Sequence, residues 1–294
     1  MAQKSQVSRL SKMTKSLASR LQQSGQFYDR VLEFPLAICD EFGKMRSRNK
    51  SSFKDALLQI PALCSMFITS LPFIMTDCEV IIDGLKFVHC PPLPSITTYH
   101  QFVSELFGKM VLQHGFHRGA SCVTIVFDKP EFLPRIRDTI HTERKNKTSK
   151  TSFVCPSKIS DEDAIPHGEI YAEALTDSKY KSLLLDYITV SFTVLAKQQI
   201  GPDTKVIIDS PTFGNTPVEV SYQQSKGLCN RANNKGEADC AVWFHAVSST
   251  HSQVLIHAGD TDIYMYGLAL FDQGHLNNKE VAVERVKDAE YVQI

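Results

Sequence analysis

The stretch CEVIIDG, residues 78–84, decides the fold, because a run of apolar, mostly β-branched side chains ends there in an acid and a glycine. Such a run, without the polar alternation of a half-exposed strand, predicts a parallel strand that is buried on both faces. Three similar runs follow along the chain. They are SCVTIVFD (121–128), TKVIIDS (204–210) and QVLIHAG (253–259).

Helical patterns separate these four strands. We expect helices over 99–112, 178–200 and 237–247, and a loop over 151–169. Strands that alternate with helices predict an α/β fold, a three-layer sandwich with a mainly parallel central sheet between helices. In such sheets ligands bind at the carboxyl ends of the strands, so the residues at those ends are the informative ones.

The residues before the first strand form a separate region. Apolar side chains from Val7 to Leu21 recur at helical spacing, which predicts an amphipathic and partly basic helix. Residues 56–75 carry no charge and have the length of a membrane span, but they contain Pro61 and Pro72, so we expect a buried helix and no membrane partner. We therefore divide the chain into a helical extension, 1–75, and an α/β domain, 76–294, with an insertion near 150–200.

The composition limits the class of protein. Of 294 residues, 32 are Lys or Arg and 32 are Asp or Glu, so the formal net charge is zero; 43% of the residues are hydrophobic. These values are typical of a globular protein and exclude a disordered, collagen-like or coiled-coil chain. Zero net charge by itself argues against nucleic acid, but cations gather in residues 1–28 and 129–150, and opposed local fields can act separately.

Cysteines and histidines give no metal-binding pattern. The eight cysteines include no CxxC pair, which indicates reduced thiols rather than a disulfide framework or a zinc site. The histidines show no HxH or HExxH spacing, so we expect most of them to be surface or core residues rather than zinc ligands. The histidines considered are His89, His114, His117, His141, His245, His251 and His257.

Carboxylates gather where the predicted strands end. Asp83 and Asp128 close the first two strands, Glu237 and Asp239 begin the helix before the last strand, and Asp260 and Asp262 follow that strand. A single such acid is more often a helix cap or a solvated side chain. If the strands are parallel, however, all six lie at one edge, and crowded carboxylates favour Mg²⁺ or Mn²⁺. Two such ions about 4 Å apart activate water and stabilise the leaving oxygen of a phosphodiester.

The ordered set of motifs resembles the catalytic core of PIN-domain nucleases of the flap-endonuclease and XPG-like branch. The matching stretches are VIIDG, VTIVFDKP, GEADCAVW and AGDTDIYMYG, and the resemblance covers about residues 76–270. It implies a structure-specific nuclease that acts on DNA, with RNA as the alternative substrate, and in which the six carboxylates hold two divalent ions. It also implies that a basic helix after Asp128 holds the scissile strand. Its candidate phosphate ligands are Arg135, Arg137, Arg144 and Lys145.

Two departures leave rival hypotheses open. About 75 residues precede the first strand, and no Gly-x-Asp-like motif supplies the family's further acid before Ile294, so we expect a chain truncated relative to the family. The first rival is a catalytically degenerate PIN-like module that binds nucleic acid or protein. The second is a glycosyltransferase that uses the DTD at 260–262. We expect an intracellular location, nuclear ahead of cytoplasmic; the basic, Arg- and Ser-containing N-terminus leaves a mitochondrial location as an alternative.

Overall fold

The computed structural model describes residues 66–129, 153–258, 262–276, 278–285 and 290–294. All of them fall in one unit, Leu58–Ile294. The amphipathic helix expected in 7–21, residues 56–65 of the apolar stretch, and the basic segment that contains Arg135 therefore lie outside the described residues. The other half of the apolar stretch, 66–75, contains the short strand β1 (Phe67–Ile68) and no part of the buried helix expected there.

A mixed sheet forms the centre of the described unit. The strands predicted from the four apolar runs are all present; they pair in parallel and are joined by β8, but antiparallel strands extend the sheet at both edges. The sheet is therefore mixed rather than mainly parallel. In spatial order the strands are β1 (Phe67–Ile68), β9 (Glu290–Gln293), β8 (Glu280–Arg285), β7 (Gln253–Ala258), β2 (Cys78–Asp83), β3 (Cys122–Val126), β4 (Lys205–Asp209), β5 (Val218–Ser221) and β6 (Gln224–Gly227).

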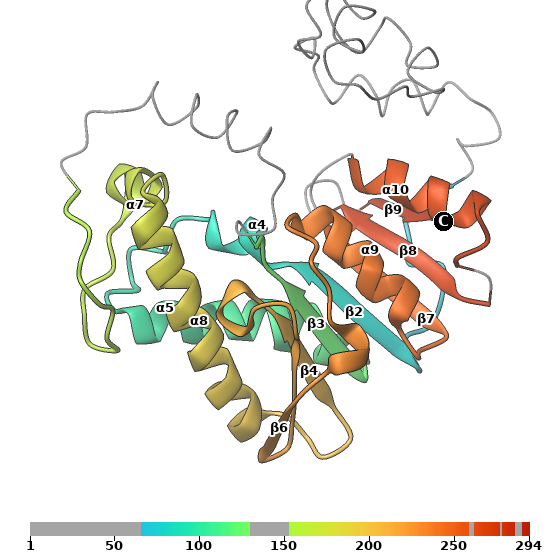
Figure 1. The fold of residues 1–294 in the computed structure, drawn as a ribbon, viewed down its shortest axis with the longest axis horizontal. Helices are drawn as coiled ribbons and strands as arrows, with labels where there is room; N and C mark the ends of the chain where they lie inside the picture. Colours follow the sequence, from blue (N-terminus) through green and yellow to red (C-terminus); the bar gives the residue numbers. More distant parts are fainter. Residues whose placement is uncertain (1–65, 130–152, 259–261, 277, 286–289) are drawn as a thin grey trace, which may run out of the picture. The chain divides into compact units, whose positions relative to one another are not determined.

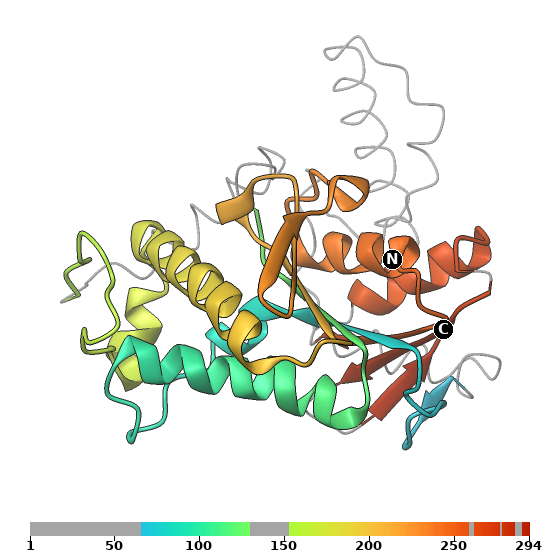
Figure 2. The same ribbon diagram turned by 90° about the horizontal axis from the view of Figure 1, so that it is seen from below.

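Helices cover both faces of this sheet and complete the expected three layers. Figures 1 and 2 show α5 and α8 on one face and α9 with α10 on the other. The α-helices are α4 (Gly84–Val88), α5 (Tyr99–Phe107), α7 (Gly168–Ala174), α8 (Ser178–Gln199), α9 (Ala238–Ser248) and α10 (Asp262–Asp272). Shorter elements are the π-helix η2 (Gly108–Gln113) and the 3₁₀ helices η3 (Phe116–Arg118), η5 (Pro211–Phe213) and η6 (Cys229–Arg231).

The strands bury both faces because each contributes to two cores. On β2, Val80 and Ile82 pack into the core shared with α5 and α8, whereas Ile81 packs into the core shared with α9 and α10. This alternation with a period of two explains why Val80, Ile81 and Ile82 are apolar in succession rather than at every second residue. The described part of the segment expected as an insertion also reaches the core, since Leu184 and Ile188 of α8 are fully buried.

The order of the parallel strands places a binding region. Along the sheet the order is β8-β7-β2-β3-β4, so the direction of progress along the chain reverses between the neighbours β2 and β7. In the sequence, 169 residues lie between Asp83, the last residue of β2, and Gln253, the first residue of β7. Ligands bind at the carboxyl ends of strands beside such a reversal. Asp83 ends β2 at this point. None of the described helices has the length and hydropathy needed to cross a membrane.

Candidate functional site

Asp83 and Asp128 lie at the carboxyl ends of the neighbouring strands β2 and β3, and both are half-buried. Asp83 is also the N-cap of α4, where its Oδ1 accepts a hydrogen bond of 3.1 Å from the amide of Leu85. Burial, and then the nearby charge of Asp128, raises the pKa of Asp83 to about 6. The two predicted acids therefore come close enough to repel, and the cap and the charge of Lys86 offset this only in part.

Gly84 is required by the packing behind these acids. A Cβ atom on this residue would lie 2.4 Å from the ring of Phe127, the residue before Asp128. No real Cβ contact is that short, so a side chain here would displace the ring. The glycine of CEVIIDG thus allows the ends of β2 and β3 to approach each other.

Asp128 connects β3 to the start of α9. Its Oδ1 accepts a hydrogen bond of 2.8 Å from the amide of Ala238, the first residue of α9. The amide of Lys129 donates to the carbonyl oxygen of Gly236 at 2.8 Å. These two bonds hold the strand end against the residues on either side of Glu237, the N-cap of α9. Glu237 and Asp239, both half-buried, therefore begin their helix beside Asp128.

The remaining predicted site residues are described only in part or not at all. Asp262 begins α10, which follows β7, but the position of its side chain is not described, and Asp260 lies outside the described residues. The four predicted phosphate ligands also lie outside the described residues. They are Arg135, Arg137, Arg144 and Lys145. Among the described carboxylates of the predicted set, no three have ligand oxygens that all lie within 4.8 Å of one another.

A fifth carboxylate at this edge, Asp209 at the end of β4, is fully buried and compensated. The Nζ of Lys129 lies 2.5 Å from its Oδ1. Nε2 of His245 lies 2.8 Å from its Oδ2, and Nδ2 of Asn233 donates to the same oxygen at 3.0 Å. Burial alone would raise the pKa of Asp209, but the hydrogen bonds and charges of these partners hold the pKa below its usual range. This cluster fastens β3, β4 and α9 together directly behind the half-buried acids.

Asp209 was missed at the sequence level although its signal resembles that of Asp83. KVIID closes in an acid just as VIID does. The sequence pattern does not reveal the charge partners of Asp209, because Lys129 and His245 are 80 and 36 residues away. Without the partners, a compensated structural acid and a free ligand look the same in the sequence.

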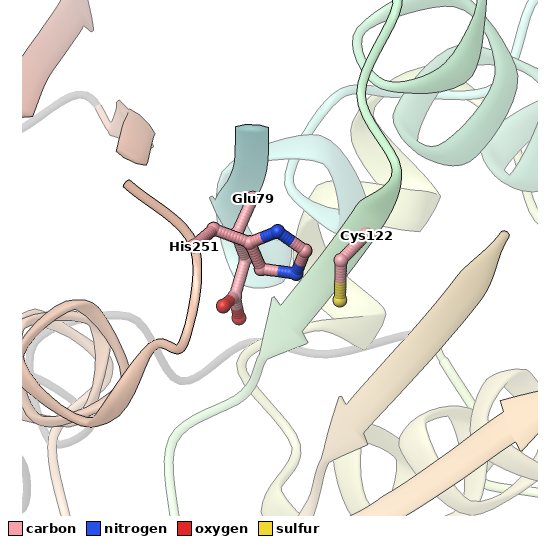
Figure 3. Close-up of side chains that lie close together, drawn as sticks. All are labelled: Glu79, Cys122 and His251. Atoms are coloured by element: carbon pink, nitrogen blue, oxygen red, sulfur yellow. The ribbon is translucent and has the colours of Figure 1, made fainter. Parts of the chain in front are cut away.

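Two groups of three side chains in the described residues could hold a metal ion by distance alone. One comprises Glu79, Cys122 and His251, drawn in Figure 3. Burial alone would raise the pKa of Glu79, but the hydrogen bonds and charge of Arg231 hold it below its usual range. Arg231 contacts both carboxylate oxygens, at 2.6 and 3.0 Å, while Thr124 and Ser249 donate to the same carboxylate.

The other members of this first group are also engaged or protonated. Burial raises the pKa of the Cys122 thiol well above its usual value, so the sulfur is not a thiolate. Nδ1 of His251 lies 2.7 Å from the carboxylate of Asp77. With a guanidinium on its only carboxylate, the group is a buried structural ion pair rather than a metal centre. The second group, His114, His257 and Glu284, lies on the other face of the sheet.

No protein-family model matches this chain, and no curated protein matches it either. Function must therefore be inferred from the geometry of the described residues.

Proposed function

We propose that the chain is a divalent-metal-dependent nuclease that hydrolyses phosphodiester bonds of structured DNA, with RNA as the alternative substrate. The observation that carries this proposal is the approach of Asp83 and Asp128 at the reversal of strand order, with the start of α9 bonded to Asp128. Acids from three separate segments are thereby brought to the one edge of the sheet where α/β folds bind ligands.

The residues at this edge fit hard divalent cations. The donors are carboxylate oxygens, which Mg²⁺ and Mn²⁺ prefer over sulfur or imidazole. Asp83, Asp128, Glu237, Asp239, Asp260 and Asp262 would hold the ions. The raised pKa of Asp83 indicates negative charge that a bound cation would relieve. When bound, two such ions supply activation of water and stabilisation of charge on the phosphate.

The chain's own groups have separable tasks in this proposal. Asp128 is held in one orientation by the amide of Ala238, so it presents its second oxygen without reorganisation. Lys129, although adjacent, is fully buried against Asp209 and cannot reach a phosphate. Positioning of the scissile phosphate therefore falls to other cations, and we assign it to Arg135, Arg137, Arg144 and Lys145. The excess positive charge over 134–150 supports this assignment.

Asp128→Asn tests the proposal most directly, because an asparagine oxygen can still accept from Ala238. We expect cleavage of labelled flap, hairpin and single-stranded DNA with Mg²⁺ or Mn²⁺, and a loss of about 100-fold or more in this variant. Asp203→Asn, an exposed acid in the loop before β4, is the matched control and should cleave like the wild type. Equal cleavage by the wild type and Asp128→Asn would contradict the proposal.

A second candidate is a degenerate module of the same fold that binds nucleic acid without cutting it. The spread of the predicted site acids favours this alternative, because no three of those with described side chains have ligand oxygens within 4.8 Å of one another. It predicts salt-dependent binding of the same DNA substrates with no cleavage in either metal. Binding that persists in Asp128→Asn, with the wild type inactive on every substrate, would support the module over the enzyme.

A further inference from the structure

A second cluster of metal-ligating side chains lies on the face of the sheet opposite to α9. His257 of β7 and Glu284 of β8 are register partners in neighbouring parallel strands. His114 follows η2 and comes over the same face. One ligand atom from each of these three residues lies within 4.8 Å of the other two.

The two imidazole rings are in contact. Their centroids are 4.3 Å apart and their planes are inclined by 42°. Phe87 of α4 packs against both rings, with centroid separations of 5.4 Å to each. The pair is thus packed on one side against an apolar ring, which limits the orientations that the two imidazoles can take.

Hydrogen bonding fixes the tautomer of His257. Its Nδ1 lies 3.0 Å from a carboxylate oxygen of Glu284, which can only accept, so Nδ1 carries the proton. The side chain is only 1% exposed, so its Nε2 atom is buried. That atom has no hydrogen-bond partner in the described residues. A carboxylate behind one ring nitrogen and an open lone pair on the other is the usual arrangement of a metal-binding histidine.

The electrostatics keep both rings neutral. Burial lowers the pKa of His257, and the carboxylate of Glu284 does not reverse this. Burial, and then the neighbouring His257, lowers the pKa of His114 to about 4. Burial alone would raise the pKa of Glu284, but hydrogen bonds from His257 and Arg118 bring it to about 2. At neutral pH the cluster therefore offers two neutral imidazoles beside one carboxylate.

We propose that His114 and His257 bind a borderline first-row metal ion such as Zn²⁺, with Glu284 orienting His257. Neutral imidazole is the donor these ions prefer, whereas Mg²⁺ prefers oxygen. Zn²⁺ bonds imidazole nitrogen at about 2.0–2.1 Å, so two shared nitrogens lie no more than about 4.2 Å apart. The two rings, with centroids 4.3 Å apart, are close enough for side-chain adjustment to bring one nitrogen of each into this range.

The neighbouring cations decide how strong the site is. Arg118 lies 2.6 Å from Glu284, and Tyr291 donates to the other carboxylate oxygen at 3.1 Å. With both oxygens in use, Glu284 serves as an orienting residue rather than as a full ligand. Arg118 and Lys86 add positive charge nearby, so we expect water to complete the coordination and the affinity to be moderate. The site does not depend on the proposed nuclease activity.

The test is Zn²⁺ binding by the full chain after treatment with a chelator. Isothermal titration should give about one ion bound at this site, and the thermal midpoint should rise with Zn²⁺ concentration. His114→Phe keeps an aromatic ring against Phe87 and removes one ligand, so the affinity should fall at least about tenfold. His100→Phe, an exposed histidine of α5, is the matched control.

Two further measurements separate this site from other sources of binding. Glu284→Gln should weaken the affinity for Zn²⁺ by about 10–100-fold if the carboxylate orients His257. Excess Mg²⁺ and the Asp128→Asn change should leave Zn²⁺ binding unaltered, because they act on the acids at the carboxyl ends of β2 and β3. The proposal is overturned if Zn²⁺ gives no thermal shift, or if the shift is the same in the wild type and His114→Phe. If His114→Phe does not fold, His114→Gln carries the same comparison.

Discussion

Glu79 and Asp83 lie on the same strand, four residues apart, yet their pKa values move in opposite directions. Glu79, at the amino end of β2, is fully buried and its pKa is lowered, because Arg231 contacts both of its oxygens. Asp83, at the carboxyl end, is only half-buried and its pKa is raised to about 6 by burial and by Asp128. The more buried acid is the more stable anion.

The difference shows that compensation, rather than depth, separates structural acids from candidate ligands in this fold. Asp209 supports the same rule from the carboxyl edge itself, since Lys129 and His245 compensate it and its pKa is lowered. Only Asp83 carries a raised pKa among the acids with resolved shifts in the described residues. An acid left in that state is one that a cation would stabilise.

Removing the guanidinium of Arg231 from Glu79, at the amino end of β2, should have the largest effect on stability. Arg231→Met leaves the buried carboxylate of Glu79 without its bidentate partner, and we expect a loss of about 3–5 kcal/mol in the free energy of unfolding, measured with urea. Adding Glu79→Gln to this variant should restore part of the loss, because no buried charge then remains.

Lys226→Met is the matched control for that comparison. Its ammonium contacts Glu219 at 3.1 Å, but the side chain is 68% exposed, so the change should cost less than about 1 kcal/mol. A similar loss in Lys226→Met and Arg231→Met would contradict the view that the amino end depends on a buried ion pair.

Lys129→Met extends the same test to the carboxyl edge. The change removes the ammonium 2.5 Å from Asp209 but leaves His245 and Asn233 in place, so we expect a somewhat smaller loss, about 2–4 kcal/mol. Urea unfolding of the variant gives the value. The orientation of Asp128 should also change, because the cluster around Asp209 links β3 to α9. Unchanged stability would mean that this cluster does not hold β3, β4 and α9 together.

The fold was predictable to the extent that local sequence determines it. The strands β2, β3, β4 and β7 follow from continuous apolar runs, because strands buried on both faces have no polar alternation. The strand β8 and the hairpin β5–β6 were not recognised: β5 (Val218–Ser221) is only partly buried and pairs with the exposed edge strand β6, and the hairpin lies in a segment with many turn residues. Pairing at the other edge, where β1 pairs with β9, depends on a partner distant in sequence.

The approach of Asp83 and Asp128 could be predicted from the sequence, but which acids are compensated by a buried cation could not. The positions of Asp83 and Asp128 followed from the strand ends, and the structure brings them together. That Asp209 is compensated while Asp83 is not could not be predicted, because it depends on which cation folds against which acid. The open Nε2 of His257 likewise depends on Glu284, 27 residues away, and no short motif contains both.

A methyl group at Gly84 should disturb the carboxyl end by crowding. Gly84→Ala places a Cβ 2.4 Å from the ring of the buried Phe127, and we expect a loss of about 1–3 kcal/mol in unfolding free energy. Gly108→Ala is the control, because a Cβ there meets nothing within 4 Å and the backbone is helical, so that variant should be slightly stabilised. Losses of equal size in both variants would contradict the close approach of β2 and β3.

Asp83→Asn should have the smallest effect and the opposite sign. Asparagine still caps α4, and it removes a carboxylate whose charged form the fold disfavours. Because the pKa is about 6 when folded and near 3.8 when unfolded, the wild type carries the cost of this charge above pH 6 and loses it as the pH falls toward 4. The variant should therefore melt about 1–3 °C higher than the wild type at pH 8, and the gain should vanish at pH 4.

Glu79→Gln completes the comparison along β2, because the lowered pKa of Glu79 reverses the sign. Its stabilising charge is fully present above the unfolded pKa, near 4.5, so this variant should be less stable than the wild type at pH 8 and approach it only as the pH falls below about 4.5. Thermal melts of both variants from pH 8 down to about pH 3 provide the measurement. If Asp83→Asn also destabilised at pH 8, Asp83 would be a compensated structural acid like Glu79, and the case for a cation at the carboxyl end would lose its electrostatic basis.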